Sequence, residues 1–523
     1  MVRRSALLLL VIYSLLLIAP VFALESSSIM SDAPLSLTDA PAAKEGANLG
    51  SILPIWSVIP FVGILLSIAI FPLVAGRWWH HNFGKVSAFW AILFAVPFLY
   101  AYGEEAVHQI LHIYFLDYFP FIILLWALYT ISGGILIKGA PTGTPIANTI
   151  LLIVGSVLAS WIGTTGAAMV LIRPYIKMNK FRKSKVHLIV FFIFLVANVG
   201  GSLTPLGDPP LFLGFLKGVP FFWTMNLLPH MLFVGSILLV VFYLWDSYMY
   251  RREGWHKKVH VLDEELDITP GEEGFAIDEQ VQMIDEKGRA SEKKIRIEVH
   301  GLVNLPLLLG VIGGVLFSGS VKLGEVTVLG IHMDIQNIIR DAFLILMGIM
   351  SLRITPKSFR EENEFTWFPI EEVGKLFAGI FITIIPALAM LGAGEQGTLG
   401  FIIAAVKEPW QYFWVTGGLS SFLDNAPTYL VFLNTACGQF FAGMPITEAV
   451  SQLIAENSIY LEAISSGAVF FGALTYIGNA PNFMVKSIAE QSDIQMPSFF
   501  GYMLYSVMVL GLIFLGVTYF FFI

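Results

Sequence analysis

Asp208 is an acidic side chain in a setting where an acid is costly. It lies in residues 199–210 (VGGSLTPLGDPP), which end the apolar run 186–199 and contain three glycines and three prolines. Because proline removes a backbone donor and glycine weakens a helix, we expect a membrane helix to unwind here. Unwound backbone persists in hydrocarbon only where it is buried in protein or lines a watery cavity, and a carboxylate at that depth by default marks an ion or substrate path.

A similar stretch of sequence occurs in the second half of the chain. Residues 201–210 (GSLTPLGDPP) align without gaps on residues 472–481 (GALTYIGNAP). Two interrupted apolar segments at corresponding places in two halves are the best sequence indication of a transporter's binding site, and a pair of kinked structural helices is the alternative. The residues expected to break the helices are Gly200, Gly201, Pro205, Gly207 and Pro209 in the first half and Gly472, Gly478 and Pro481 in the second.

Composition indicates a membrane protein that crosses the bilayer many times. Hydrophobic residues make up 56% of the chain and charged residues 13%, whereas a soluble protein has about one-quarter charged residues. No basic patch supports nucleic-acid binding. The single cysteine, Cys437, excludes an internal disulfide and a cysteine metal cluster. The sequence has neither a His-Glu-x-x-His motif nor a Walker loop, so we expect no enzyme, no ATP-driven pump and no cofactor.

Three segments are expected to lie outside the repeated spans. Residues 1–23 have two arginines, an apolar run and small residues at the end, which is the pattern of a secretory signal peptide. An uncleaved first helix is the alternative. Residues 24–51 are expected to form a polar extracytoplasmic tail, and residues 251–299, rich in Glu, Asp and Lys, a cytoplasmic linker.

Charge placement predicts how the first half crosses the membrane. One crossing needs about 20 apolar residues, and Lys and Arg favour the cytoplasmic side. Read as a single span, residues 145–172 would place the basic loop 173–185 outside. The conflict disappears if residues 145–172 form a re-entrant hairpin that enters from the cytoplasm and turns at residues 163–167 (GTTGA). The spans are then 52–74, 86–102, 115–137, the broken helix that begins at 186, and 231–250.

The second half repeats this plan with the opposite orientation. No Lys or Arg occurs between Glu408 and Val485, so this stretch is expected outside. It contains a second hairpin, residues 414–436, which enters from outside. The predicted fold is an all-α membrane protein with two inverted-topology repeats, residues 52–250 and 300–523, each with five spans, one re-entrant hairpin and one broken helix.

Residues 200–210 (GGSLTPLGDPP), residues 421–427 (SFLDNAP) and the two-hairpin plan resemble the ion-transporter superfamily. It includes NhaD-type sodium/proton antiporters, citrate and dicarboxylate carriers, and arsenite permeases. The resemblance covers residues 52–523. It implies that each hairpin tip meets the break of its own half near the membrane midplane, in a homodimer. The pair Asp424-Asn425 is closest to the antiporter branch, and residues 207–210 are close to the citrate-transport branch. A bacterial cytoplasmic (inner) membrane is the expected location.

If each tip meets its own break, two oxygen-rich sites result. In the first hairpin Thr164 and Thr165 are expected in the places of Asp424 and Asn425. All-oxygen ligation suits sodium, with one aspartate at each site. A carboxyl group removed from water also holds a proton when sodium is absent, so competition between the two ions permits antiport. The first site would gather Thr164, Thr165, Ser202, Thr204 and Asp208, and the second Asp424, Asn425, Thr475 and Asn479.

A carboxylate substrate is the alternative cargo. The N-termini of half-helices can hold an anion without Arg or Lys, and the two aspartates would then bind coupling sodium beside citrate or a dicarboxylate. The aspartates would oppose such a substrate directly, and no membrane-embedded Arg or Lys favours it. The sequence therefore favours a sodium/proton antiporter with alternating access over a sodium- or proton-coupled citrate or dicarboxylate transporter.

Overall fold

The computed structural model describes residues 49–139, 142–254 and 298–523. The signal peptide expected at residues 1–23 lies outside the described residues. Most of the expected N-terminal tail and most of the expected central linker also lie outside them.

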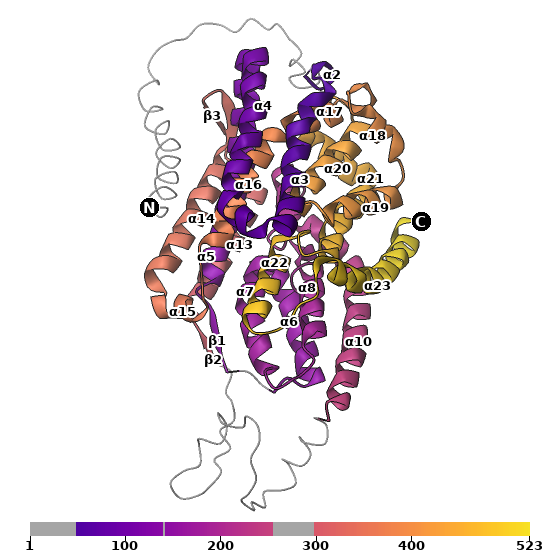
Figure 1. The fold of residues 1–523 in the computed structure, drawn as a ribbon. Helices are drawn as coiled ribbons and strands as arrows, with labels where there is room; N and C mark the ends of the chain where they lie inside the picture. The colour runs from indigo at the N-terminus through magenta and orange to yellow at the C-terminus, as the bar shows by residue number, and fades with distance from the viewer. Residues whose placement is uncertain (1–48, 140–141, 255–297) are drawn as a thin grey trace, which may run out of the picture.

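The first half of the chain is a series of helices joined by short connections (Figure 1). The elements are α2 (Leu49–Ile52), η2 (Ile55–Val58), α3 (Ile59–Val74), α4 (Gly76–Ile113), η3 (Tyr114–Tyr118), α5 (Phe119–Ser132), β1 (Leu136–Lys138), α6 (Pro145–Ile162), α7 (Thr164–Met178), α8 (Val186–Leu195), η4 (Val199–Leu203), α9 (Pro209–Leu216), η5 (Phe221–Leu227) and α10 (Leu228–Arg252).

The second half has the same mainly helical character. Its elements are β2 (Glu298–His300), α13 (Asn304–Ser320), β3 (Glu325–Val328), β4 (Ile331–Asp334), α14 (Ile335–Ile354), α15 (Lys357–Glu362), α16 (Phe368–Thr383), α17 (Ile385–Gly392), η6 (Gly394–Gln396), α18 (Gly400–Ala405), α19 (Pro409–Ser420), α20 (Asn425–Phe440), α21 (Ile446–Phe471), η7 (Gly472–Leu474), α22 (Ala480–Gln491), α23 (Phe499–Val517) and η8 (Thr518–Phe522).

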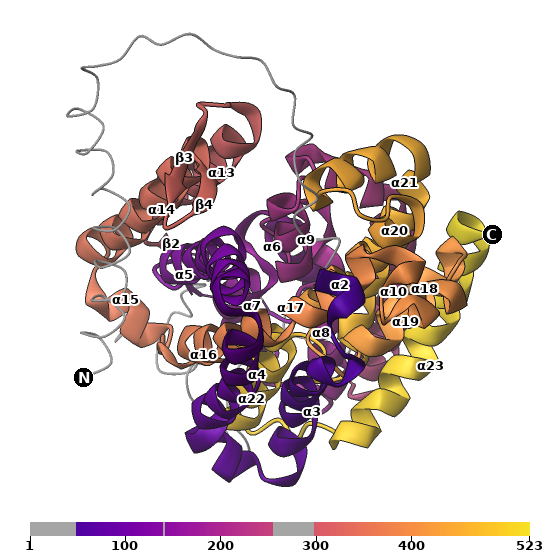
Figure 2. The same ribbon diagram turned by 90° about the horizontal axis from the view of Figure 1, so that it is seen from above.

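The four short strands form two antiparallel pairs. β1 pairs with β2, with Leu136 opposite His300, and so joins the first half to the second. β3 pairs with β4 as a hairpin between α13 and α14. Seen from above, α13 and α14 lie beside α5 at one side of the molecule, and α23 lies at the other (Figure 2).

Within the described residues, seven helices are long and apolar enough to cross a membrane, and the bent pair α16–α17 would make an eighth. The chain is therefore a mainly helical integral membrane protein. The span expected at 86–102 and most of the span expected at 115–137 lie in one helical run, Gly76–Ser132. The second expected span reaches too far, because its last two residues belong to β1. Gly103 interrupts this run with φ 52° and ψ −120°, a conformation that glycine adopts without steric cost. The assignment of five spans to each half stays a prediction.

Two helical hairpins carry the tips that the sequence singled out. Gly163, with φ 82°, separates α6 from α7. Asn148 near the start of α6 and Asn179 just after α7 exchange side-chain hydrogen bonds of 2.8 and 3.0 Å, so these helices run antiparallel. α19 and α20 also fold back on each other, since Tyr412 donates to Gln439 at 2.8 Å. Each hairpin extends further toward its open end than the sequence indicated.

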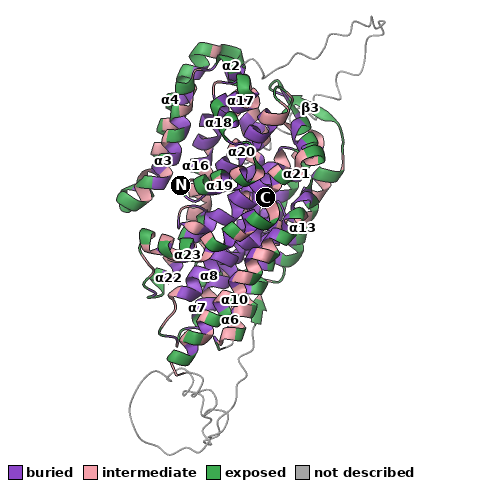
Figure 3. Ribbon diagram, turned by 90° about the vertical axis from the view of Figure 1, so that its right-hand side faces the viewer, coloured by how far each residue is buried: buried purple, intermediate pink, exposed green. Residues whose placement is uncertain are grey.

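The broken helix of the first half lies inside protein. The residues of α8 from His187 to Leu195 are all buried, and buried residues gather around α8 in Figure 3. Exposed apolar side chains occur on outer helices such as α23, where Leu512 is 73% exposed, as expected for contact with lipid. Because α8 has no face toward lipid, the unwound backbone that follows it is shielded as a membrane requires.

Candidate functional site

Each broken helix passes close to itself at a pair of glycines. A Cβ on Gly207 would lie 2.1 Å from the carbonyl oxygen of Gly201, and a Cβ on Gly478 would lie 2.7 Å from that of Gly472. The two breaks thus need glycine because the backbone itself fills the space of a side chain. The other expected breaking residues lie in the same turns: Gly200 in η4, Pro205 in the unwound segment, Pro209 at the start of α9 and Pro481 in the first turn of α22.

In each half, a threonine of the broken helix forms a hydrogen bond with the hairpin of the same half. The hydroxyl of Thr204 donates to the carbonyl oxygen of Ser160, and the hydroxyl of Thr475 donates to that of Ser421. Each hydroxyl also accepts a backbone N–H from its own break, at 3.1 Å in the first half and 3.0 Å in the second. Both tips therefore meet their own breaks, and the backbone engages both threonine hydroxyls.

The same contacts show how the two hairpins correspond. Ser160 and Ser421 hold equivalent places, since the hydroxyl of each also donates to a carbonyl of its own break, at 2.5 and 3.3 Å. Counting from these serines, Thr164 corresponds to Asn425. The expected correspondence, which matched Thr165 with Asn425, is wrong by one residue, because the hairpin tips share no gapless motif that fixes their register.

Side chains from both predicted sites donate hydrogen bonds to the carboxylate of Asp208. Its Oδ1 accepts from Thr164 Oγ1 at 3.1 Å and from Asn479 Nδ2 at 2.9 Å, and its Oδ2 accepts from Asn425 Nδ2 at 2.6 Å. The sequence expectation of two separate sites, each within its own half, therefore needs correction. The two amides of the second half converge on the acid of the first half because four helices, α7, α9, α20 and α22, begin at this point.

The surroundings of Asp208 leave its charge without a cationic partner. Its side-chain donors are one hydroxyl and two amides, all neutral. In the described part of the chain, no Lys, Arg or His forms an ion pair with this buried residue. Among the same residues, the Oδ1 atom of Asn425 is buried and accepts no hydrogen bond. A buried carboxylate beside an unused amide oxygen is an arrangement that a proton or a metal cation would complete.

The remaining predicted residues lie near this centre in less direct roles. Asp424 is the N-cap of α20, where its Oδ1 accepts from the Ala426 N–H at 3.0 Å, and the residue as a whole is partly exposed. Ser202 is buried and donates to the Val199 carbonyl at 2.9 Å. Thr165 follows Thr164 in α7. Of the nine predicted side chains, four meet directly: Asp208, Thr164, Asn425 and Asn479.

Two buried amides beside this centre, Asn198 and Asn482, are not among the residues predicted from the sequence. Both are fully buried, and Asn198 Nδ2 donates to Asn482 Oδ1 at 2.7 Å. Neither belongs to the identical positions of the repeated motif. Asn198 could have been found as a polar side chain within the apolar run 186–199, because such residues in membrane helices usually find a hydrogen-bond partner in another helix.

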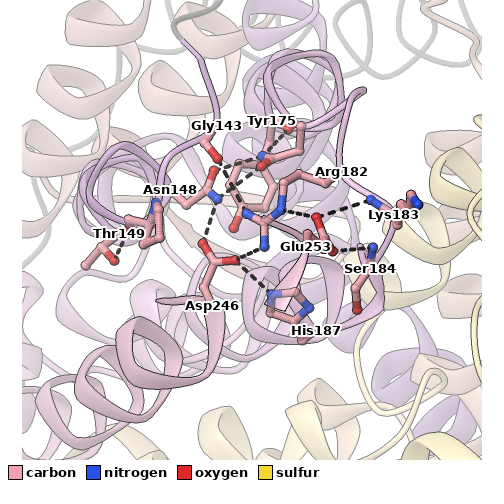
Figure 4. A network of polar contacts seen from close by, with 12 residues as sticks. Gly143, Asn148, Thr149, Tyr175, Arg182, Lys183, Ser184, His187, Asp246 and Glu253 are labelled. Atoms are coloured by element: carbon pink, nitrogen blue, oxygen red, sulfur yellow. Dashed lines mark hydrogen bonds and ion pairs between the residues drawn. The ribbon is translucent and has the colours of Figure 1, made fainter. Parts of the chain in front are cut away.

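A charged network closes the open end of the first hairpin (Figure 4). Asp246 of α10 accepts from Arg182 at 2.8 Å, from His187 of α8 at 2.9 Å and from Asn148 of α6 at 2.8 Å. Arg182 also pairs with Glu253 at 3.0 Å. The network joins α6, α8 and α10 to the loop after α7, and so fixes the base of the hairpin whose tip contributes Thr164.

Comparison with known protein families identifies one family whose model spans both halves of the chain. No curated protein matches the chain. A family model with the description "Putative citrate transport" matches residues 50–522. The match includes both hairpins and both broken helices, and it covers nearly all of the described residues. The chain belongs to the family described as putative citrate transport.

Proposed function

We propose that this chain is a secondary active transporter that exchanges sodium for protons at Asp208. The observation that carries this proposal is a buried carboxylate that, within the described residues, has only neutral side-chain donors and lies beside an Asn425 Oδ1 that accepts no hydrogen bond. A buried negative charge without a cationic partner is costly, so a proton or a metal cation must neutralise it. Carboxylate, amide and hydroxyl oxygens suit a hard cation such as sodium.

One carboxylate can be neutralised by sodium or by a proton, and this competition gives exchange. Asn425 Oδ1 and the Thr164 hydroxyl would supply further oxygens when sodium binds. The positive N-terminal ends of α7, α9, α20 and α22 offset part of the negative charge, which helps Asp208 to release its proton as sodium arrives. Asp424, partly exposed at the second tip, would serve as a second carboxylate for the approaching cation.

Alternating access in this proposal relies on two inverted repeats. The loop 173–185 after the first hairpin is basic, whereas residues 409–485, which include the second hairpin, contain no Lys or Arg. α6 and α7 lie in the lower half of Figure 1, and α19 and α20 lie in the upper half. Both observations support hairpins that enter from opposite sides and meet at Asp208. A homodimer in a bacterial inner membrane is part of the same proposal.

Citrate or a dicarboxylate, carried together with sodium, is the second candidate cargo. The family description favours it. The four helix N-termini that meet at Asp208 also favour it, because such ends bind carboxylates. In this candidate Asp208 binds the coupling sodium instead of carrying a proton. The absence of an Arg or Lys ion pair with Asp208 among the described residues makes cation exchange the first choice.

Purified protein in vesicles that contain a pH-sensitive dye distinguishes these cargoes. We expect sodium alone to change the internal pH, and Asp208→Asn to abolish that change. Glu462→Gln is the matched control, since Glu462 is a half-buried acid of α21 that has no contact with Asp208. No response to sodium alone, together with sodium-dependent uptake of labelled citrate or succinate, would overturn the antiport proposal in favour of the second candidate.

A further inference from the structure

A chain of buried amides leads from the second broken helix to Asp208. It starts at Asn482 in the first turn of α22, whose Nδ2 donates to the carbonyl oxygens of Gly472 at 2.7 Å and Thr475 at 2.9 Å. Backbone carbonyls can only accept hydrogen bonds. They therefore fix which end of the Asn482 amide is its nitrogen, and its oxygen must face the other way.

The orientation of the Asn482 amide determines the orientation of the Asn198 amide. Asn198 Nδ2 donates to Asn482 Oδ1 at 2.7 Å and to the Ile193 carbonyl at 2.8 Å. Since both of these partners are acceptors, the oxygen of Asn198 faces the remaining neighbour, Asn479, whose Nδ2 donates to it at 3.3 Å. Asn198 and Asn482 are both fully buried, so water does not compete for these contacts.

Asn479 completes the chain at the carboxylate. Its Nδ2 faces three acceptors: Asn198 Oδ1, the Ala197 carbonyl at 3.1 Å and Asp208 Oδ1 at 2.9 Å. If the amide of Asn479 turned over, its oxygen would face all three acceptors and each contact would become repulsive. The chain therefore holds N–H groups toward Asp208, and N–H donors stabilise negative charge on a carboxylate.

We propose that Asn198 and Asn482 are positioning residues that set the sodium affinity of Asp208 by fixing the amide of Asn479. The inference rests on the proposed function, because it assumes that sodium binds at Asp208. Neither residue contacts the carboxylate directly. Since Asn198 belongs to the first half and Asn482 to the second, their hydrogen bond also joins the two broken helices, so the two breaks hold one geometry around the cation.

The aligned positions of the two halves indicate which substitutions suit these buried places. The gapless alignment of the two breaks places Asn198 opposite Val469 and Asn482 opposite Leu211. Both aliphatic residues are buried at their own places. Asn198→Val and Asn482→Leu therefore exchange each amide for the residue that the other half uses. Asn434→Leu is the matched control, because Asn434 is a buried amide of α20 that donates to Leu430 in its own helix at 2.9 Å.

The test measures the sodium concentration that gives half of the maximal thermal stabilisation of the purified protein, at several pH values. Loss of a residue that orients a metal ligand weakens metal affinity about 10–100-fold. We expect each of Asn198→Val and Asn482→Leu to raise this concentration at least about tenfold, with the largest increase at low pH where protons compete. Because the two residues act through one hydrogen bond, the double variant should be no worse than either single variant. The control should match the wild type.

The outcomes separate this inference from the proposed function. If sodium stabilises the wild type but both amide variants respond like the control, the positioning role is wrong while sodium binding stands. If the effects of the two variants multiply in the double variant, Asn198 and Asn482 do not act through one hydrogen bond, and the proposed positioning role is wrong. If sodium stabilises no form of the protein, both proposals fail. Should Asn198→Val not fold, Asn198→Ser, which cannot reach Asn482 and Asn479 together, carries the same expectation.

Discussion

The buried pair of Arg182 and Asp246 gives a stability prediction that can be worked out from its contacts. Both side chains are fully buried, and their atoms lie 2.8 Å apart. Removing Asp246 leaves Arg182 with one carboxylate, that of Glu253, and takes an acceptor from His187 and from Asn148 (Figure 4). Breaking a buried pair by removing one partner costs about 3–5 kcal/mol. We expect Asp246→Leu to lower the free energy of unfolding by this amount.

A double variant shows whether the cost comes from the pair. Replacing both charges by apolar residues avoids an uncompensated charge and is often close to neutral relative to the intact pair. Arg182→Met with Asp246→Leu should therefore cost no more than about 3–5 kcal/mol, not the sum of the two single changes. Glu362→Gln is the control, since its pair with Lys138 is 46% and 42% exposed and is worth at most about 1 kcal/mol.

Titration of the protein with SDS in mixed micelles measures these free energies. Agreement requires a large loss in each single variant and a smaller loss in the double variant than the sum predicts. A free energy of unfolding for Asp246→Leu within about 1 kcal/mol of the wild type, or single losses that add fully in the double variant, would show that the pair does not stabilise the fold in this way.

Two further predictions concern the breaks and the topology. Gly207→Ala places a Cβ 2.1 Å from a carbonyl oxygen, so we expect a loss of about 3 kcal/mol or more and no sodium response. Gly235→Ala, with no atom near the new Cβ, should be neutral or stabilise by up to about 1 kcal/mol. Equal effects of the two substitutions in thermal unfolding would contradict the close approach of Gly207 to Gly201. In a Cys437→Ser background, a cysteine at Lys180 should react with impermeant reagent from the cytoplasm, and one at Glu456 from outside. Labelling of both from one side would contradict the inverted repeats.

The sequence predicts the breaks well because their cause is local. Gly207 and Gly478 occur at identical places in a repeated motif, and proline and glycine have the same effect on a helix wherever they lie. The hairpins also follow from sequence, since a basic loop on the wrong side excludes a single span. These features depend on residue type and spacing, and both can be counted along the chain.

The centre of the site depends on contacts between the halves, which spacing does not reveal. Asn425 and Asn479 approach Asp208 across more than 200 residues of sequence separation. The repeated motif indicates only that each break resembles the other, so spacing alone predicts two separate sites. Arg182 shows the same limit. In the sequence it is one charge of a basic cytoplasmic loop. In the structure it is only 2% exposed, because it pairs with Asp246, which lies far from it in the sequence on α10.

If sodium and a proton compete for the carboxylate of Asp208, sodium binding must release a proton from the protein. Purified protein in weakly buffered detergent solution, with a pH indicator, is titrated with sodium chloride and, as the ionic control, with choline chloride. We expect sodium to release about one proton from each wild-type chain, and to release none from Asp208→Asn. Sodium binding without proton release in the wild type, or an equal release from Asp208→Asn, would contradict the assignment of Asp208 as the exchange site.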